Sequence, residues 1–421
     1  MTPSARLQAV LDLLLEIEKT PRPADALVSG YFRARRYIGS HDRAAVSAML
    51  YDILRHHARL TWWLEKNKAE TTPRARLLAY LALVEKKLPR AVEALFNGKK
   101  FSPEPFIDDE RKLVRRLEGH TLAHPDMPDA IAVECPEWAA ASLKQRFGKN
   151  FTHEMQALLQ PAPLDLRVNP LKATREDILA ELIKLGLKAA PCPLSPYGIR
   201  VAERPNLAAL LMLKNGAVEI QDEGSQLVAF LVDAKPGMRV VDFCAGAGGK
   251  TLAIAAQMQN KGRITACDVL ENRLKRSAER FRRAGAHNIE IKPLSSERDP
   301  WVKKHKGAFD RVLVDAPCTG TGAWRRNPDA RWRSLGPGLK ALVKLQADIL
   351  DSAARLVKPG GRLIYATCSL LREENERQIE KFLAEHADFK IVLYKTDGDY
   401  LSLTPAQHGT DGFFAAVMER G

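Results

Sequence analysis

The chain has 421 residues, of which 45% are hydrophobic and 28% charged, and its mean hydropathy of −0.26 is that of a globular protein. This length exceeds what one hydrophobic core supports, so two or three domains are expected, and no apolar run approaches the roughly 20 residues of a membrane span. The formal charge of +14 and the pI of about 9.5 indicate a polyanionic partner.

The six cysteines show neither the paired spacing of a disulfide framework nor, with histidines, the spacing of a zinc site. We therefore expect a protein of the reducing cytoplasm that holds no metal. The first residues lead into a helix carrying Asp12 and Glu16, which is not the pattern of a secretory signal peptide. No sequence feature requires an oligomer, and a monomer is expected.

The first 140 residues have helical periodicity. Apolar residues recur at helical spacing in two stretches: Leu7, Val10, Leu11, Leu14 and Ile17, then Val46, Leu50, Ile53 and Leu54. Residues 41–55 resemble part of a NusB-like RNA-binding helical domain, so residues 1–140 are expected to form such a domain, with plain helical packing as the alternative. Trp62 and Trp63 are expected to fill its core rather than to stack on bases.

Residues 141–215 have the pattern of a small α/β module. Residues 164–169 and 198–201 read as strands, and Thr174 is placed to cap a helix that runs to Leu185. The longer remainder, residues 216–421, alternates apolar runs with helical stretches, which is typical of a parallel sheet covered by helices.

A strand, a glycine-rich turn and a helix follow one another from residue 239. The turn allows the backbone to approach a ligand closely, although Gly-x-Gly-Gly alone also fits a dinucleotide. A phosphate-binding loop would need glycine where Cys244 stands, so nucleoside triphosphate binding is not expected. Asp268 ends the next strand 20 positions after Gly248 (268 − 248), the usual distance for an acid that binds the ribose hydroxyls of a nucleoside cofactor.

Two cysteines follow apolar, β-branched runs that read as buried parallel strands: Cys318 after residues 312–317 and Cys368 after residues 363–367. Ligands of such sheets bind at the carboxyl ends of the strands. Methylation of cytosine at carbon 5 needs a thiolate that adds to carbon 6, an acid near nitrogen 3 and a group that assists release, which would fit Cys368, Asp315 and Cys318. The alternative, a cysteine that acts as a small buried hydrophobe, is adopted for Cys135, Cys192, Cys244 and Cys267 as far as thiol chemistry is concerned.

Residues 315–322, Asp-Ala-Pro-Cys-Thr-Gly-Thr-Gly, and residues 365–369, Tyr-Ala-Thr-Cys-Ser, resemble the two catalytic motifs of the RsmB/Sun-type RNA cytosine-5 methyltransferases. The resemblance implies that Cys368 is the nucleophile, that Cys318 is needed to release methylated RNA, and that Asp315 contacts the target base. The related DNA enzymes attack from the Pro-Cys cysteine and lack the Thr-Cys-Ser motif. The resemblance extends over residues 160–421, including Arg-Val-Asn-Pro at 167–170.

The same resemblance implies S-adenosylmethionine as cofactor and a Rossmann-like class I methyltransferase domain at residues 216–421. The residues implied at the amino-acid end of the cofactor are Cys244, Ala245, Gly246, Ala247, Gly248, Gly249 and Lys250. Asp268 and Arg273 would lie at the ribose, and Lys250 and Asp315 are assigned both to the cofactor site and to catalysis. The family's usual acid beside the adenine is missing, which leaves Ser295, Ser296 and Glu297 as open alternatives.

RNA is the expected partner, with ribosomal RNA the expected substrate. Basic residues concentrate near the proposed site in two groups, of which the second directly follows the Asp-Ala-Pro-Cys loop: Arg273, Lys275, Arg276, Arg280, Arg282 and Arg283, then Arg325, Arg326, Arg331 and Arg333. The second group, interleaved with Trp324 and Trp332, is expected to contact RNA. The rival interpretations are the same chemistry on transfer RNA or DNA, a non-catalytic RNA-binding assembly or transcription factor, and a dinucleotide-dependent oxidoreductase.

Overall fold

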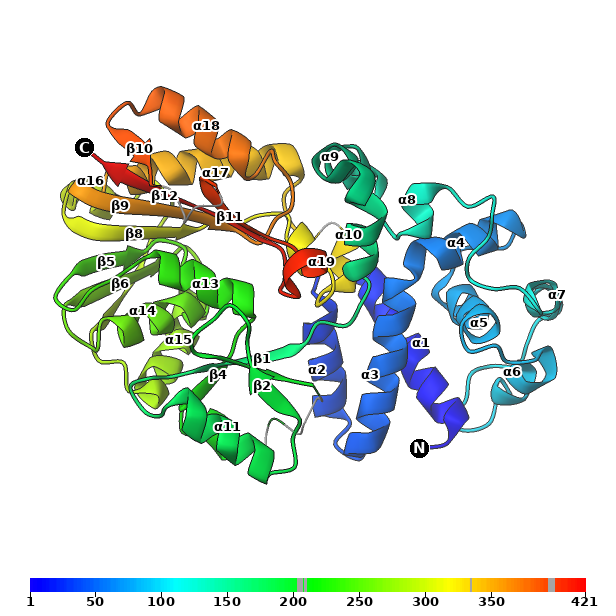
Figure 1. The fold of residues 1–421 in the computed structure, drawn as a ribbon. Coiled ribbons are helices and arrows are strands. Elements are labelled where there is room, and N and C mark those ends of the chain that lie inside the picture. Colours follow the sequence, from blue (N-terminus) through cyan, green and yellow to red (C-terminus); the bar gives the residue numbers. More distant parts are fainter. Residues whose placement is uncertain (203–206, 208–209, 334, 393–397) are drawn as a thin grey trace. The chain divides into compact units, whose positions relative to one another are not determined.

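The computed structural model describes residues 1–202, 207, 210–333, 335–392 and 398–421 (Figure 1). The chain forms two compact units: residues 1–160 with 324–337, and residues 161–323 with 338–421. The expected division into domains at 1–140, 141–215 and 216–421 stays a prediction. Within these described ranges, no helix is both long and apolar enough to cross a membrane.

The first unit is helical. Its helices are α1 (Pro3–Lys19), α2 (Ala24–Ala34), α3 (Ser40–Arg55), α4 (His57–Lys66), α5 (Pro73–Leu83), α6 (Pro89–Leu95), α7 (Asp108–Leu117), α8 (Asp129–Ala132), α9 (Glu137–Phe147), α10 (Phe151–Ala157) and the 3₁₀ turns η1 (Gly148–Asn150) and η4 (Pro328–Arg331). Thr2 and Thr72 cap α1 and α5, each followed by proline in the first turn. The apolar residues predicted on α1 and α3 are buried, as is Trp63. The NusB-like character of this unit stays a prediction.

Residues 324–337 belong to this helical unit although they follow the Asp-Ala-Pro-Cys motif in sequence. Trp324 is fully buried, and the guanidinium of Arg331 donates hydrogen bonds of 2.9 Å to the backbone carbonyls of Glu134 and Leu158. Arg325 and Arg331 are only 4% and 2% exposed. Because both side chains are buried, the expectation that these two arginines contact RNA is wrong. Arg331 lies in the interior of the helical unit.

The second unit contains a small antiparallel sheet of strand order β2-β3-β1-β4. Its elements are β1 (Leu164–Val168), α11 (Arg175–Lys184), β2 (Ala189–Pro191), β3 (Gly198–Val201), α12 (Leu211–Lys214) and β4 (Val218–Ile220). The Thr174 hydroxyl accepts a hydrogen bond from the backbone N–H of Asp177 and so caps α11. The strands and the capped helix predicted here are confirmed.

The large sheet has the strand order β10-β12-β9-β8-β5-β6-β7, and β11 pairs with β12. Its elements are α13 (Glu223–Leu231), β5 (Arg239–Asp242), α14 (Gly249–Gln257), β6 (Arg263–Asp268), α15 (Glu271–Ala284), β7 (Ile289–Pro293), α16 (Pro300–Lys304), β8 (Phe309–Asp315), η3 (Thr321–Ala323), α17 (Leu339–Ala354), β9 (Val357–Thr367), α18 (Glu376–Glu385), β10 (Phe389–Ile391), β11 (Tyr400–Leu403), α19 (Pro405–His408) and β12 (Phe413–Arg420). Helices α14 and α15 cover one face and α17 and α18 the other (Figure 1). The expected α/β class is confirmed.

The strand order places a topological switch point at β5. The chain runs outward from β5 through β6 to β7 and then returns to β8 on the other side of β5, with parallel pairing throughout. Ligands of open α/β sheets bind at such a point, beyond the carboxyl ends of the strands. The strands end there at Asp242, Asp268, Asp315 and Thr367.

The small sheet is joined to the large one through the Arg-Val-Asn-Pro segment. Arg167 donates a hydrogen bond of 2.6 Å to the backbone carbonyl of Gly249, at the start of α14, and another to Gln221. Asn169 Nδ2 donates 2.8 Å to the carbonyl of Ala284, at the end of α15. Burial lowers the pKa of Arg167 to about 10. This segment therefore holds the start of α14, which follows the glycine-rich turn, and the end of α15 in place.

Candidate active site

The thiols of Cys318 and Cys368 lie side by side at the carboxyl ends of neighbouring strands β8 and β9. Their Sγ atoms are 3.4 Å apart, and both side chains are partly exposed. The backbone N–H of Gly322 donates 2.9 Å to the carbonyl of Cys368, which ties the two loops together. The hydrogen bond to Cys368, burial and the charge of Glu374 raise the pKa of Cys318 well above its usual range. A shifted pKa at the edge of a sheet where ligands bind marks a candidate functional site.

Lys250 and Asp315 form an ion pair beside the thiols, with Nζ 2.6 Å from Oδ2. Lys250 begins α14 and Asp315 ends β8, so the strand order brings them to the switch point together. Burial lowers the pKa of Lys250, but the charge and hydrogen bond of Asp315 outweigh it and raise the pKa overall. Lys250 is therefore a fixed positive charge at this site rather than a solvated lysine.

The glycine-rich turn leaves the end of β5 and begins α14. Gly248 caps α14 in the left-handed conformation (φ +78°), and a Cβ there would lie 2.4 Å from the ring of Phe281. Only glycine fits this position, because both the backbone angle and the packing exclude a side chain. Arg280 of α15 donates a hydrogen bond of 2.5 Å to the carbonyl of Ala247 and so stabilises the turn.

The predicted ribose residues lie next to this turn. Asp268 accepts hydrogen bonds of 2.8 Å from the backbone N–H groups of Gly246 and Leu270. The guanidinium of Arg273 approaches Gly246, with Nη2 3.6 Å from the position of a Cβ there. Within the described part of the chain, no hydrogen bond joins Asp268 to Arg273. Each of them lies beside Gly246 separately.

Asp242 at the end of β5 is buried, and one of its carboxylate oxygens lacks a partner. Oδ2 accepts 2.7 Å from the hydroxyl of Thr251, whereas Oδ1 has no hydrogen bond among the described residues. Burial raises the pKa of Asp242 to about 7 and that of the neighbouring Cys244 thiol well above its usual range. A buried acceptor left open beside a glycine-rich turn fits a ligand with a cationic or hydroxyl donor. These residues thus fit a nucleoside cofactor with an amino-acid end.

The candidates for the adenine contact follow β7. Ser295 donates to Asp299 through both its backbone N–H and its hydroxyl, each at 2.8 Å. Glu297 lies 3.4 Å from Arg298, and its backbone carbonyl accepts a hydrogen bond from Ser352. The backbone N–H of Arg298 donates 3.1 Å to the hydroxyl of Ser296. The choice among Ser295, Ser296 and Glu297 stays open.

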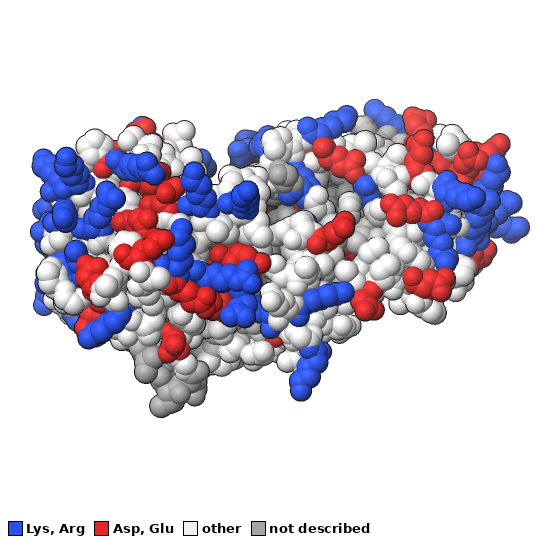
Figure 2. Space-filling view, turned by 90° about the horizontal axis from the view of Figure 1, so that it is seen from above, with Lys and Arg blue, Asp and Glu red and all other residues white. Residues whose placement is uncertain are grey.

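The basic residues of α15 divide into structural and exposed ones. Arg280 and Arg283 each lie 2.7 Å from a carboxylate oxygen of Glu219, and Lys275 pairs with Glu271 on the same helix. Part of the predicted basic cluster is thus used to hold the small sheet against α15. On the face shown in Figure 2, Lys and Arg side chains are interspersed with Asp and Glu rather than forming one continuous field.

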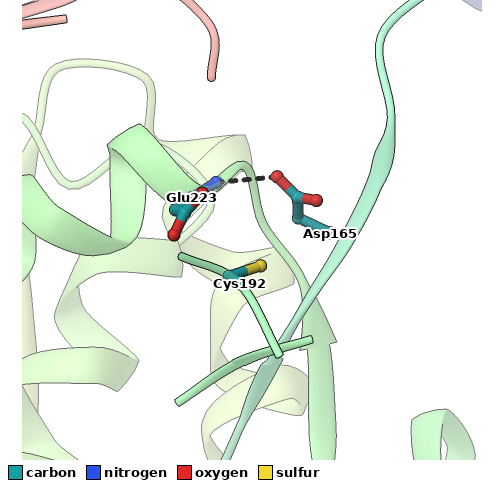
Figure 3. A group of neighbouring side chains, drawn as sticks. All are labelled: Asp165, Cys192 and Glu223. Atoms are coloured by element: carbon teal, nitrogen blue, oxygen red, sulfur yellow. Dashed lines mark hydrogen bonds between the residues drawn. The ribbon is translucent and has the colours of Figure 1, made fainter. Parts of the chain in front are cut away.

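A second group of reactive residues, Asp165, Cys192 and Glu223, lies buried where the small sheet meets α13 (Figure 3). The carboxylates already have partners: Asp165 binds Arg200 at 2.7 and 2.9 Å and the backbone N–H of Glu223 at 3.2 Å. Burial and the two carboxylates raise the pKa of Cys192, which keeps it a neutral thiol. We assign this cluster a structural role, and the expectation that the protein holds no metal stays a prediction.

Sequence reasoning missed several residues around the thiols. Glu374 and Asn375 are fully buried, although the run Arg-Glu-Glu-Asn-Glu at 372–376 has the composition of a solvated surface. Asn375 bonds to Thr367 Oγ1 at 2.5 Å and to the carbonyl of Ser369 at 2.9 Å. The only sequence signal for them is their position directly after the Thr-Cys-Ser motif.

Comparison with known families gives two matches along the chain. Residues 229–419 match the family described as 16S rRNA methyltransferase RsmB/F. Residues 135–208 match the ferredoxin-like domain of RsmF/B-like methyltransferases. The first match contains Cys318, Cys368, the glycine-rich turn and the large sheet up to the next-to-last residue of β12, and the second contains β1 to β3 of the small sheet.

Individual proteins are similar over much of the chain. The Ribosomal RNA small subunit methyltransferase B of Photorhabdus laumondii is 34% identical over 68% of this chain and 66% of its own length, slightly under two thirds. The protein of the same name from Pectobacterium atrosepticum is 31% identical over 91% of this chain and 92% of its own length. The crystal structure of PH0851 has a TM-score of 0.83 and 26% identity, and covers 100% of this chain and 99% of that one.

Proposed function

This chain belongs to the RsmB/F family of S-adenosylmethionine-dependent RNA methyltransferases, and from that premise we propose that it methylates carbon 5 of a cytosine in RNA. The observation that carries the proposal is the pair of thiols 3.4 Å apart beside an ion-paired carboxylate. Direct transfer to a nitrogen or a hydroxyl needs no thiol, whereas transfer to carbon 5 of cytosine needs a nucleophile and a release step.

In the proposed reaction, the thiolate of Cys368 adds to carbon 6 of the cytosine and makes carbon 5 nucleophilic. S-adenosylmethionine supplies the electrophilic methyl group. As negative charge develops at ring nitrogen 3, Asp315 shares with that nitrogen a proton supplied by the Lys250 ammonium. Lys250, paired with Asp315 at 2.6 Å, holds that carboxyl group in place.

Release of the product requires loss of the proton on carbon 5. A base takes this proton, the electron pair restores the double bond between carbons 5 and 6, and Cys368 leaves as a thiolate. We assign this step to Cys318, acting as the base after its own proton has passed to solvent, because its Sγ lies 3.4 Å from that of Cys368.

The cofactor site proposed for this reaction surrounds the glycine-rich turn. We assign residues 244–250 to the amino-acid end of S-adenosylmethionine and Asp268 with Arg273 to its ribose. The open oxygen of Asp242 is the acceptor that the sequence prediction did not include. Because a buried oxygen without a partner is costly, the Asp242 carboxyl group favours a ligand with a hydrogen-bond donor at this position.

We propose that the substrate is ribosomal RNA of the small subunit. Two observations support this: the RNA that the names of the relatives print, and the net charge of +14. The target cytosine must be unpaired or leave its helix to reach the thiols, which costs least in a loop or at an exposed position. Methylation confined to perfect duplex RNA would contradict this substrate class.

The test is a trapping experiment with the Cys318→Ala variant, S-adenosylmethionine and total RNA from cells that lack this enzyme. Because release is blocked, a protein–RNA adduct that survives denaturation should accumulate, and sequencing of the attached RNA would identify the target. The double variant Cys318→Ala/Cys368→Ala is the matched control and should give no adduct. An adduct that persists without Cys368, or rapid turnover by Cys318→Ala, would contradict the assigned thiol roles.

A further inference from the structure

Glu374 lies in the turn between β9 and α18, and its carboxylate joins the two cysteine-bearing loops. Oε1 accepts a hydrogen bond of 2.9 Å from the backbone N–H of Thr319, and Oε2 accepts one of 2.5 Å from the Thr319 hydroxyl. Oε2 also accepts a hydrogen bond from the hydroxyl of Ser369. Thr319 directly follows Cys318, and Ser369 directly follows Cys368. One carboxylate therefore holds the residue next to each thiol.

Further contacts fix Glu374 itself. Gln346 of α17 donates 2.9 Å to Oε1, and the Tyr365 hydroxyl of β9 donates 2.7 Å to the backbone carbonyl of Glu374. The same Gln346 nitrogen donates 2.9 Å to the carbonyl of Pro317, which precedes Cys318. Glu374 is fully buried, and no lysine, arginine or histidine forms an ion pair with it in the ranges that the structure describes.

Burial of a carboxylate without a cation opposes folding, even where donors satisfy its oxygens. A glutamine or an apolar residue would fill this space at lower cost if Glu374 served only to pack the turn. The acid instead stands where both thiol loops converge. That position indicates a role in the geometry of the thiols.

We propose that Glu374 is a positioning residue that holds the Cys318 and Cys368 thiols at the separation needed to act on neighbouring atoms of one cytosine ring. This inference rests on the proposed function, in which Cys368 bonds to carbon 6 and Cys318 serves carbon 5. Misplacement of a reacting group by about 1 Å lowers a rate by roughly 100-fold, so a clamp on both loops has a measurable effect.

The charge of Glu374 has a second effect on the pair. It acts together with the hydrogen bond that Cys318 makes to Cys368 and with burial to raise the pKa of Cys318. Loss of this charge should therefore shift the ionisation of Cys318 to lower pH. That shift can be measured without RNA, by the pH dependence of alkylation.

Two substitutions separate geometry from charge. In Glu374→Gln, the carbonyl can keep the bonds from Thr319 N–H and Gln346, while the amide donates to the Thr319 and Ser369 hydroxyls, which can accept. Glu374→Gln thus preserves the clamp and removes the charge, whereas Glu374→Ala removes both. Glu373→Gln is the matched control, because it removes the same charge one residue away, from a carboxylate that lies 3.7 Å from Arg377.

The experiment measures kcat and KM for methyl transfer to RNA, together with alkylation of each cysteine by iodoacetamide, resolved by mass spectrometry. We expect Glu374→Ala to lower kcat at least ~100-fold with KM for RNA within about twofold, since the clamp acts on the thiols and not on RNA binding. Glu374→Gln should keep kcat within about tenfold of the wild type and alkylate Cys318 at lower pH. Glu373→Gln should match the wild type in both measurements.

Thermal melting checks that each variant is folded. If Glu374→Ala does not fold, Thr319→Val decides, because it removes a hydroxyl that the Glu374 carboxylate holds. Wild-type kcat in folded Thr319→Val overturns the inference. Wild-type kcat in Glu374→Ala also overturns it and leaves the proposed function intact. By contrast, a wild-type protein with no Cys368-dependent transfer would remove the proposed function, and this inference with it.

Discussion

At the scale of single residues, the site is defined by groups whose ionisation the fold has altered. Asp242 ends β5, Lys250 lies in the first turn of α14 and Cys318 follows β8, and each has a shifted pKa. Shifts of this kind concentrate where a protein handles protons or charged ligands. Motifs in the sequence predicted Lys250 and Cys318 as site residues. They did not predict Asp242, because an aspartate at the end of a strand need not have a function.

Asp242 allows a pH prediction with a definite sign. Burial raises its pKa to about 7, above the value near ~3.9 expected in the unfolded chain. The folded state therefore binds this proton more tightly, and the stability it contributes is complete below pH ~4 and is lost as the pH rises through about 7. Asp242→Asn cannot ionise, so the free energy of unfolding of the wild type should fall relative to the variant between pH ~4 and ~8, as measured by urea unfolding without cofactor.

Asp310→Asn is the control for this measurement. Burial of Asp310 opposes its ionisation, but hydrogen bonds from Lys358 and from the backbone N–H of Arg239 lower its pKa overall. Its contribution is present above the unfolded pKa and lost only in acid, so this variant should leave the slope above pH ~4 unchanged. Parallel stability curves for Asp242→Asn and the wild type would contradict the assignment.

At the scale of elements, the two motif loops are locked by backbone contact with the last strand. The backbone N–H of Gly412, just before β12, donates 2.9 Å to the carbonyl of Gly322, whose own N–H donates to Cys368. A Cβ on Gly322 would lie 2.3 Å from the carbonyl oxygen of Gly412. The sequence showed both glycines, but nothing in it indicated that they meet.

Gly322→Ala should therefore destabilise the protein by about 1–3 kcal/mol, because the added methyl group forces the loop and the tail apart. Methyl transfer should also fall, since the Gly322 N–H no longer holds the Cys368 carbonyl in place. Gly338→Ala is the matched control: no atom lies within 4 Å of a Cβ there, and the residue is exposed. Urea unfolding of both variants checks this prediction. If Gly322→Ala and Gly338→Ala unfold at the same urea concentration, the close approach of Gly322 to Gly412 is not rigid.

The predictable parts of the fold were those with local signals. The periodicity of α1 and α3, the Thr174 cap of α11 and the apolar runs of β8 and β9 each indicated their element, because capping and alternation are read within a few residues. Long-range features had no such signal. The contact of Glu374 with Thr319 and the docking of Arg167 on Gly249 depend on strand order, which periodicity does not encode.

At the scale of the whole molecule, the path of residues 324–337 differs most from the sequence interpretation. A run of arginine and tryptophan after a catalytic motif has the composition of an RNA-binding loop. Here Trp324 and Arg331 are core residues of the helical unit, so the chain leaves the large sheet after η3 and returns to it at α17. Composition alone could not distinguish these outcomes, because a buried arginine satisfied by backbone carbonyls is identical in sequence to an exposed one.

In the proposed function, Cys368 is the nucleophile of an RNA cytosine-5 methyltransferase. The most direct test supplies S-adenosylmethionine and RNA from cells lacking the enzyme to the wild type, to Cys368→Ala and to Cys135→Ala, a buried cysteine of the helical unit. The RNA is then digested and its nucleosides are quantified by mass spectrometry. We expect 5-methylcytidine from the wild type and from Cys135→Ala, and a rate at least ~10³-fold lower from Cys368→Ala. A different methylated nucleoside, or full activity without Cys368, would contradict the account.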